Sequence, residues 1–220
     1  MATDGSLQSA VVCGVELLYS STLSDGAPAE SARLWPLTEV VARFLLDSYP
    51  LEHGLLGRTV VELGAGTAAL SCFVAKAYPT AACVVATDLP EVVPTMQATV
   101  AANRGCNTVQ AKALAWGASL STVAPSGVHL VLCCECAYWG GWSLLCNDTR
   151  GPLLRTLQDV PAGTVLLLAF TVRDADREIT FLRGLLKMYV ECGCAPGTTP
   201  WQSALEGDAV VLSLQRLTPD

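Results

Sequence analysis

Short apolar runs alternate along the chain with longer segments that suit helices. The apolar runs predict strands over residues 59–63, 83–87, 107–111, 129–134, 164–170 and 209–216. The segments between and before them predict helices over residues 36–48, 68–77, 91–103, 149–158 and 177–189. Strands that alternate with helices predict an α/β fold, with a parallel sheet covered by helices on both faces.

The first part of the chain is less regular. Residues 11–18 could form a short strand of an N-terminal hairpin, and residues 24–30 are rich in Gly, Pro, Ser and Ala, which predicts a loop. Pro36 then suits the first turn of a helix. We therefore expect residues 1–32 to form an extension or hairpin, and residues 33–220 to form one domain.

Composition limits the class of protein. The chain has 220 residues, of which 51% are hydrophobic and 15% charged, which suits one globular domain with a sizeable core. Its net charge is −7 and its isoelectric point about 4.8, so a general affinity for phosphate backbones is not expected. We therefore expect no nucleic-acid partner, and the charge is compatible with a basic protein partner or with simple solubility.

Targeting signals and cysteines bear on the compartment. The first residues lack the basic flank and apolar core of a signal peptide, and no apolar run is long enough for a bilayer. The ten cysteines lie mostly within apolar runs, which favours reduced core thiols over a disulfide framework. The expectation is a cytoplasmic protein with no membrane partner.

The most informative segment is residues 59–67, Thr-Val-Val-Glu-Leu-Gly-Ala-Gly-Thr. A second apolar run, residues 83–87, ends in Asp88. Spaced glycines after a strand let the backbone approach a ligand closely, and a carboxylate at the end of the next strand suits a ribose diol. Together they predict a nucleotide-type pocket at the carboxyl ends of two neighbouring parallel strands. The glycine motif alone also fits a nicotinamide dinucleotide.

Three further features narrow the choice of cofactor. Glu62 precedes the first glycine and would face a cationic amino group better than a pyrophosphate; alternatively, it meets solvent or a helix terminus. Trp116 follows the third strand, where its indole could stack on a purine or simply belong to the core or a lid. Glu135 and Tyr138 follow the fourth strand and would set a carboxylate and a phenol at the mouth, or serve as a capping acid and a core tyrosine.

An ordered set of motifs resembles those of the class I S-adenosylmethionine-dependent methyltransferases, and within them the family-16 seven-strand protein lysine methyltransferases. The matching stretches are Leu34-Trp35-Pro36, residues 60–67, residues 86–90, residues 114–117 and Glu135-Cys136-Ala137-Tyr138. The resemblance implies a Rossmann-like three-layer sandwich whose seven-stranded sheet is mostly parallel, with the last strand antiparallel. It also implies methyl transfer from S-adenosyl-L-methionine to a lysine side chain of a protein.

The same resemblance implies roles for individual residues. Glu135 and Tyr138 would line the substrate side as the catalytic pair, followed in the chain by Trp139 and Trp142. The expected cofactor-binding residues are Trp35, Glu62, Gly64, Ala65, Gly66, Asp88, Leu89, Trp116 and Cys134. Among these, Asp88 would hold the ribose hydroxyls, Trp116 would flank the adenine and Trp35 would close the pocket.

The chain departs from the family pattern at two positions. Ala68 stands where the family commonly has a third glycine, a mild change if the residue lies inside a helix. Ala115 stands where the family has an acid, which removes a polar partner near the adenine. These two departures leave open a non-catalytic binding module. The fold also leaves open a methyltransferase for protein arginine or a small molecule, and the glycine motif leaves open a nicotinamide-dependent oxidoreductase.

Other patterns carry less weight. Cys133-Cys134-x-Cys136 and Cys192-x-Cys194 lack the usual zinc-ligand spacing and a nearby histidine pair, so no metal site is expected. The two histidines, His53 and His129, belong to no evident triad. Residues 173–178 are predicted to form a solvated, partly self-paired loop and helix start, which in the family can border the substrate. We expect a monomer.

Overall fold

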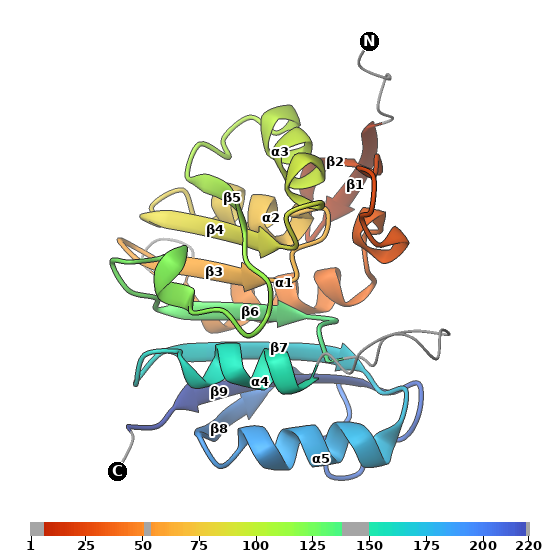
Figure 1. The fold of residues 1–220 in the computed structure, drawn as a ribbon, viewed down its shortest axis with the longest axis vertical. Helices are drawn as coiled ribbons and strands as arrows, with labels where there is room; N and C mark the ends of the chain where they lie inside the picture. Colours follow the sequence, from red (N-terminus) through yellow and green to blue (C-terminus); the bar gives the residue numbers. More distant parts are fainter. Residues whose placement is uncertain (1–6, 51–53, 138–149, 219–220) are drawn as a thin grey trace.

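A seven-stranded sheet forms the centre of the molecule, in the order β5-β4-β3-β6-β7-β9-β8 (Figure 1). The computed structural model describes residues 7–50, 54–137 and 150–218. The strands are β3 (Thr59–Leu63), β4 (Cys83–Asp88), β5 (Val109–Ala113), β6 (Leu130–Cys134), β7 (Val165–Thr171), β8 (Tyr189–Cys194) and β9 (Ala209–Arg216). Strands β3 to β7 pair in parallel, and β9 runs antiparallel to both β7 and β8. The predicted fold class, including the antiparallel last strand, is confirmed.

Helices cover both faces of this sheet and make the three layers. The α-helices are α1 (Leu37–Ser48), α2 (Ala69–Ala77), α3 (Val93–Ala102), α4 (Arg150–Gln158) and α5 (Ala175–Leu185), with short 3₁₀ turns η1 (Ala29–Ala32) and η2 (Leu120–Thr122). Side chains alternate along a strand, so neighbouring residues serve different cores. Val60 packs in the cluster that holds residues of α1, α2 and α3, whereas Val61 packs with those of α4 and α5.

The N-terminal segment forms a hairpin of β1 (Leu7–Val12) and β2 (Val15–Ser20). The predicted single strand over residues 11–18 is wrong, because it runs across the turn. Cys13 and Gly14 form this turn with φ of 46° and 80°, a pair of left-handed conformations typical of two-residue hairpin turns. The Cys13 amide also donates to Glu39 Oε2 of α1 at 2.8 Å, which fixes the turn against the domain.

Most predicted elements are correct within two residues, and residues 59–63 and 209–216 match in full. Besides the strand predicted over residues 11–18, the exception is the predicted helix over residues 177–189. Helix α5 ends at Leu185, and residues 189–194 instead form β8, an edge strand that sequence analysis missed. This strand contains a glycine and a β-bulge, and most of its residues are exposed, so no apolar alternation marks it.

In the described parts of the chain, no helix combines the length and apolar character needed to cross a membrane.

Asn103, which follows α3, holds the hairpin to the domain. Its Oδ1 accepts hydrogen bonds from the Leu18 amide at 3.1 Å and from Lys76 Nζ at 3.0 Å, and its Nδ2 donates to the Leu18 carbonyl. The Ser20 amide donates to Thr99 Oγ1 at 2.9 Å beside it. The buried Asn103 thus pairs both backbone groups of a hairpin residue with the helix layer.

We predict that Asn103→Ala lowers the free energy of unfolding by about 2 kcal/mol, because it leaves backbone and side-chain groups at a buried junction without partners. Urea unfolding measures the change. The control is Asn107→Ala, since Asn107 is an exposed turn residue, and we expect it to stay within about 0.5 kcal/mol of the wild type. Equal effects of the two substitutions would contradict the anchoring role.

Candidate active site

The carboxyl ends of β3 and β4 lie next to each other at one edge of the sheet, and a glycine turn follows β3 (Figure 1). Gly64 and Gly66 have φ of 63° and 52°, in the left-handed region that favours glycine. A Cβ atom on Gly64 would lie 2.9 Å from Cys136 Sγ and 3.1 Å from Cζ2 of Trp116. One on Gly66 would lie 3.1 Å from the Ser31 carbonyl oxygen. The turn is therefore enclosed by three other segments of the chain.

Asp88 connects the end of β4 to this turn. Its Oδ2 accepts from the Gly66 amide at 2.8 Å, and its Oδ1 accepts from the Leu89 amide at 2.7 Å. The Ala65 amide donates to the Thr87 carbonyl at 2.9 Å, which brings the turn closer still to β4. Burial raises the pKa of Asp88, although the two amide bonds oppose this shift. Each carboxylate oxygen retains lone-pair capacity for a ligand hydroxyl.

Glu62 lies in the last part of β3 and is only 4% exposed. Its Oε2 accepts from the Ser71 hydroxyl, in the first turn of α2, at 2.5 Å. Desolvation raises the pKa of Glu62 to about 7, and the negative charge of Asp88 adds to this rise. In this structure Glu62 therefore contacts the start of a helix, which was one of the alternatives to a cationic ligand group. The same carboxylate is also available, by its charge, to a cationic group.

Ala68 does not lie inside α2, as the mild interpretation of this substitution required. It precedes the helix with φ of 60° and ψ of 21°, a left-handed conformation. For an alanine this conformation costs about 1–2 kcal/mol, which a glycine would avoid. Ala68 is fully buried, and its amide donates to the Ala65 carbonyl at 2.7 Å. The family's glycine has a physical reason at this position, and this chain carries local backbone strain instead.

Glu135, directly after β6, is the predicted substrate-side residue that falls within the described parts of the chain. Its backbone is left-handed, with φ of 58°, and its side chain is 4% exposed. Its Oε1 accepts from the Thr171 hydroxyl and its Oε2 from Arg173 Nη2, both at 2.7 Å. Sequence analysis missed this ion pair, because residues 173–178 were predicted to form a solvated, partly self-paired loop and helix start. The pair of Arg177 with Asp174, at 3.1 Å, fits that description, and so do the bonds from the Arg173 and Asp174 amides to Glu178.

Trp35 joins the N-terminal segment to the same site. Its ring centroid lies 5.9 Å from Cζ of Arg173 and 5.7 Å from Cζ of Arg33. Cys134 is the last residue of β6 and directly precedes Glu135. Burial raises the pKa of its thiol, with further contributions from Glu62 and Glu135. The structure therefore brings the predicted residues of β3, β4 and β6 to one end of the sheet, with Trp116 against Gly64.

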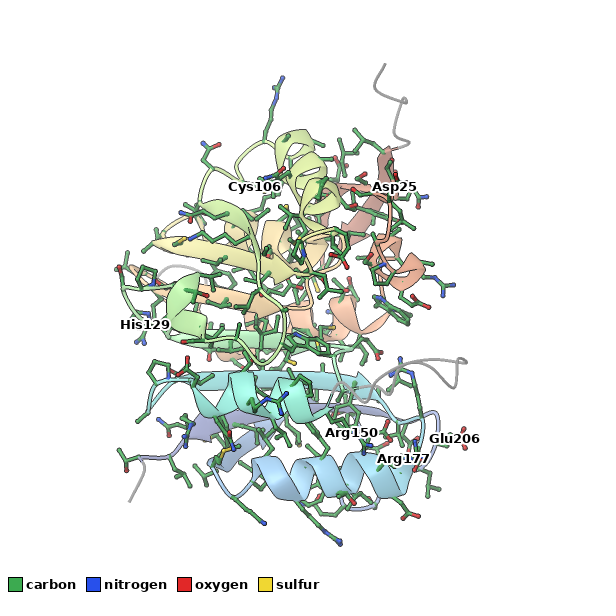
Figure 2. All side chains as sticks on the ribbon, in the orientation of Figure 1. Asp25, Cys106, His129, Arg150, Arg177 and Glu206 are labelled. Carbon is green, nitrogen blue, oxygen red and sulfur yellow. The ribbon has the colours of Figure 1, made fainter. Side chains whose placement is uncertain are left out.

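The remaining predictions concern the other aromatic residues, the two histidines and a metal site. Tyr138, Trp139, Trp142 and His53 lie outside the described residues. His129 precedes β6 at the amino end of the strands, far from the site, where its Nδ1 accepts from the Thr59 amide at 3.1 Å (Figure 2). Within residues 7–50, 54–137 and 150–218, no three His, Cys, Asp or Glu side chains gather as a metal site would require.

Comparison with known families shows which family the chain belongs to. The sequence profile of a family described as "Lysine methyltransferase" matches residues 23–188. The chain belongs to this lysine methyltransferase family. Protein-lysine methyltransferase METTL21E of Mus musculus is 31% identical over 106 residues, which cover 47% of this chain and 42% of that protein. The matched segment thus spans less than half the length of the curated relatives.

Solved structures show the same fold at low identity. SMU.776, solved in complex with SAH, superposes with a TM-score of 0.62 at 10% identity, over 98% of this chain and 57% of that chain. TYW2 of P. horikoshii, in complex with MeSAdo, superposes with a TM-score of 0.55 at 14% identity, over 99% and 73% of the two chains. These likenesses show that this chain has the Rossmann-like fold of the methyltransferase structures.

We predict that Gly64→Ala lowers the free energy of unfolding by about 2 kcal/mol more than Gly57→Ala. Both glycines have nearly the same φ, 63° and 66°, so both substitutions impose the same left-handed strain. Only at Gly64 would the new methyl group also crowd Cys136 and Trp116, whereas Gly57 has open space around it. Urea unfolding of the two variants makes the comparison, and equal losses would contradict the close packing of the turn.

The raised pKa of Glu62 predicts a pH-dependent stability. In the unfolded chain Glu62 ionises near its ordinary pKa of about 4.3, whereas the folded protein retains the proton up to about pH 7. The folded state therefore binds more protons between these values, and its stability falls as pH rises through them. We expect Glu62→Gln to match the wild type near pH 4 and to exceed its free energy of unfolding by on the order of 2 kcal/mol at pH 8. A constant difference in urea unfolding across this range would refute the assignment.

Proposed function

We propose that this chain is an S-adenosyl-L-methionine-dependent methyltransferase that transfers a methyl group to a lysine side chain of a protein. The observation that carries the proposal is the pair of Asp88 and the glycine turn at the adjacent ends of β3 and β4. It supplies a carboxylate for ribose hydroxyls beside a backbone that a ligand can approach closely. Membership of the lysine methyltransferase family, and the SAH and MeSAdo held by two proteins of the same fold, support the choice of cofactor.

The proposed cofactor contacts follow the geometry of the site. Asp88 would bind the ribose, the turn from Gly64 to Gly66 would border the methionine part, and Glu62 would face its amino group. An ammonium group near Glu62 favours the ionised carboxylate, so ligand binding opposes the effect of burial. Leu89 and Trp116 would flank the adenine, with Cys134 and Trp35 completing the pocket.

The reaction requires an uncharged nucleophile. When bound, S-adenosylmethionine supplies a methyl group on a positively charged sulfur. A lysine side chain has an ordinary pKa of about 10.4, so it must lose a proton before it attacks. The protein's main contribution is to hold the amine nitrogen in line with the methyl carbon at about 3 Å, and to exclude water, which disfavours the ammonium form. We assign Glu135 and Tyr138 to the substrate side of this arrangement.

The proposal includes a domain organisation and a cellular setting. Residues 33–220 would form the catalytic domain and residues 1–32 its N-terminal extension, as a monomer. A reducing compartment such as the cytoplasm is supported by the nine cysteines in the described parts of the chain, all of which are free thiols. The acidic net charge supports a basic, lysine-bearing protein as partner, rather than nucleic acid or membrane.

The test is transfer of labelled methyl to proteins of a cell lysate, followed by residue-level mass spectrometry, together with calorimetric titration of S-adenosylhomocysteine. We expect Asp88→Ala to lose at least about tenfold in cofactor affinity, equivalent to about 1.4 kcal/mol, and to lose transfer with it. Glu135→Ala should lose transfer while its affinity for S-adenosylhomocysteine stays within about threefold of the wild type.

The matched control is Asp47→Ala, because Asp47 is an exposed acid of α1 away from the site. It should retain both binding and transfer. Tight binding of NAD in place of S-adenosylhomocysteine would reject the cofactor, and label on arginine or on small molecules alone would reject the acceptor. Cofactor binding without transfer to any protein would favour a binding module.

A further inference from the structure

The cation that contacts the Glu135 carboxylate in this structure is Arg173. Its Nη2 lies 2.7 Å from Glu135 Oε2, and the Thr171 hydroxyl satisfies Oε1. The Glu135 side chain is 4% exposed and that of Arg173 34% exposed, so this ion pair is partly buried, with the carboxylate as its enclosed partner. A substrate ammonium that reached the same carboxylate would meet a charge that is already compensated.

Three groups hold Arg173 in place, two at its guanidinium and one at its backbone. Glu135 binds it from the end of β6, and the ring of Trp35 lies beside it, with its centroid 5.9 Å from Cζ. Its own backbone is fixed by the buried Glu178, whose two oxygens accept from the Arg173 amide at 3.1 and 3.2 Å. Glu178 Oε2 also accepts from the Asp174 amide at 2.9 Å. The Arg173 side chain nevertheless remains 34% exposed, so the positive partner of the ion pair reaches solvent.

We propose that Arg173 is a positioning residue of the methyl-transfer site, whose guanidinium neutralises Glu135 and thereby lets the substrate lysine bind as an uncharged amine. This inference rests on the proposed function. An unpaired carboxylate beside the incoming lysine would stabilise its ammonium form, which cannot attack the methyl carbon. A fixed guanidinium at the same carboxylate removes that effect and itself disfavours a second positive charge nearby.

Among the other charged and titratable groups of the described residues around Glu135, we identify none that compensates its negative charge as Arg173 does. The Cys134 thiol is adjacent, and burial raises its pKa well above the ordinary value, so it stays uncharged. Glu62 lies beyond Cys134, with its pKa raised to about 7. Glu178 is bound to backbone amides, and burial raises its pKa too. Arg33 lies at the Trp35 ring, with Cζ 5.7 Å from the centroid.

The experiment compares Arg173→Ala, Arg173→Lys and Arg177→Ala, using as acceptor the lysate protein that wild type labels. Arg177 is the matched control, because it lies four residues along the chain, at the start of α5 (Figure 2), and pairs with Asp174. We expect Arg173→Ala to move the midpoint of the kcat–pH profile up by about one unit and to lower kcat at pH 7.5 by about tenfold. Arg173→Lys should restore the midpoint to within about 0.3 units, and Arg177→Ala should follow the wild type.

Calorimetric titration of S-adenosylhomocysteine gives a second measurement that needs no acceptor. We expect its affinity for Arg173→Ala to stay within about threefold of that for the wild type. A tenfold loss would assign Arg173 to cofactor support, an unmoved pH midpoint would leave it a purely structural role, and faster transfer would make it a barrier; each overturns the proposal. Failure of the wild type to bind S-adenosylhomocysteine or to label any protein would instead overturn the proposed function.

Discussion

The hydrogen bond from the Gly66 amide to Asp88 is the contact on which the site depends. At 2.8 Å it ties the turn after β3 to the carboxyl end of β4, the neighbouring parallel strand. The bond requires a left-handed backbone at the turn, which Gly64 and Gly66 adopt without steric cost. Because the turn lies so close to β4, Trp116 and Cys136 can pack directly on Gly64, and Ser31 on Gly66.

Buried acids distinguish this end of the sheet from the rest of the core. Glu62, Glu135 and Glu178 are all nearly inaccessible to solvent, and each has a different kind of partner. Glu62 has the Ser71 hydroxyl, Glu135 has a guanidinium and Glu178 has backbone amides. A buried carboxylate is costly unless it is paired or protonated, so these contacts decide which acid can carry charge. On this basis Glu135 is the acid whose charge is compensated directly.

Local strain accompanies this arrangement. Ala68 and Glu135 are both left-handed although neither is glycine, and they follow β3 and β6, which pair with each other. Strain of this kind persists only where surrounding contacts fix the backbone, and it commonly marks functional sites. At Glu135 the ion pair with Arg173 and the Thr171 hydroxyl supply such contacts. At Ala68 the buried environment of the helix start supplies them.

Local patterns were sufficient for the fold class, the glycine turn and Asp88. These features depend on residues close in the chain: apolar runs specify strands, glycines specify the turn, and a strand end places the carboxylate. The edge strand β8 escaped because an exposed strand with a bulge has no apolar alternation. The conformation of Ala68 and the pairing of Glu135 with Arg173, 38 positions away, were decided by tertiary structure. The ion pair results from the packing of the loops after β6 and β7 around one buried carboxylate, and the strain at Ala68 from the buried start of α2. No spacing within the sequence encodes either arrangement.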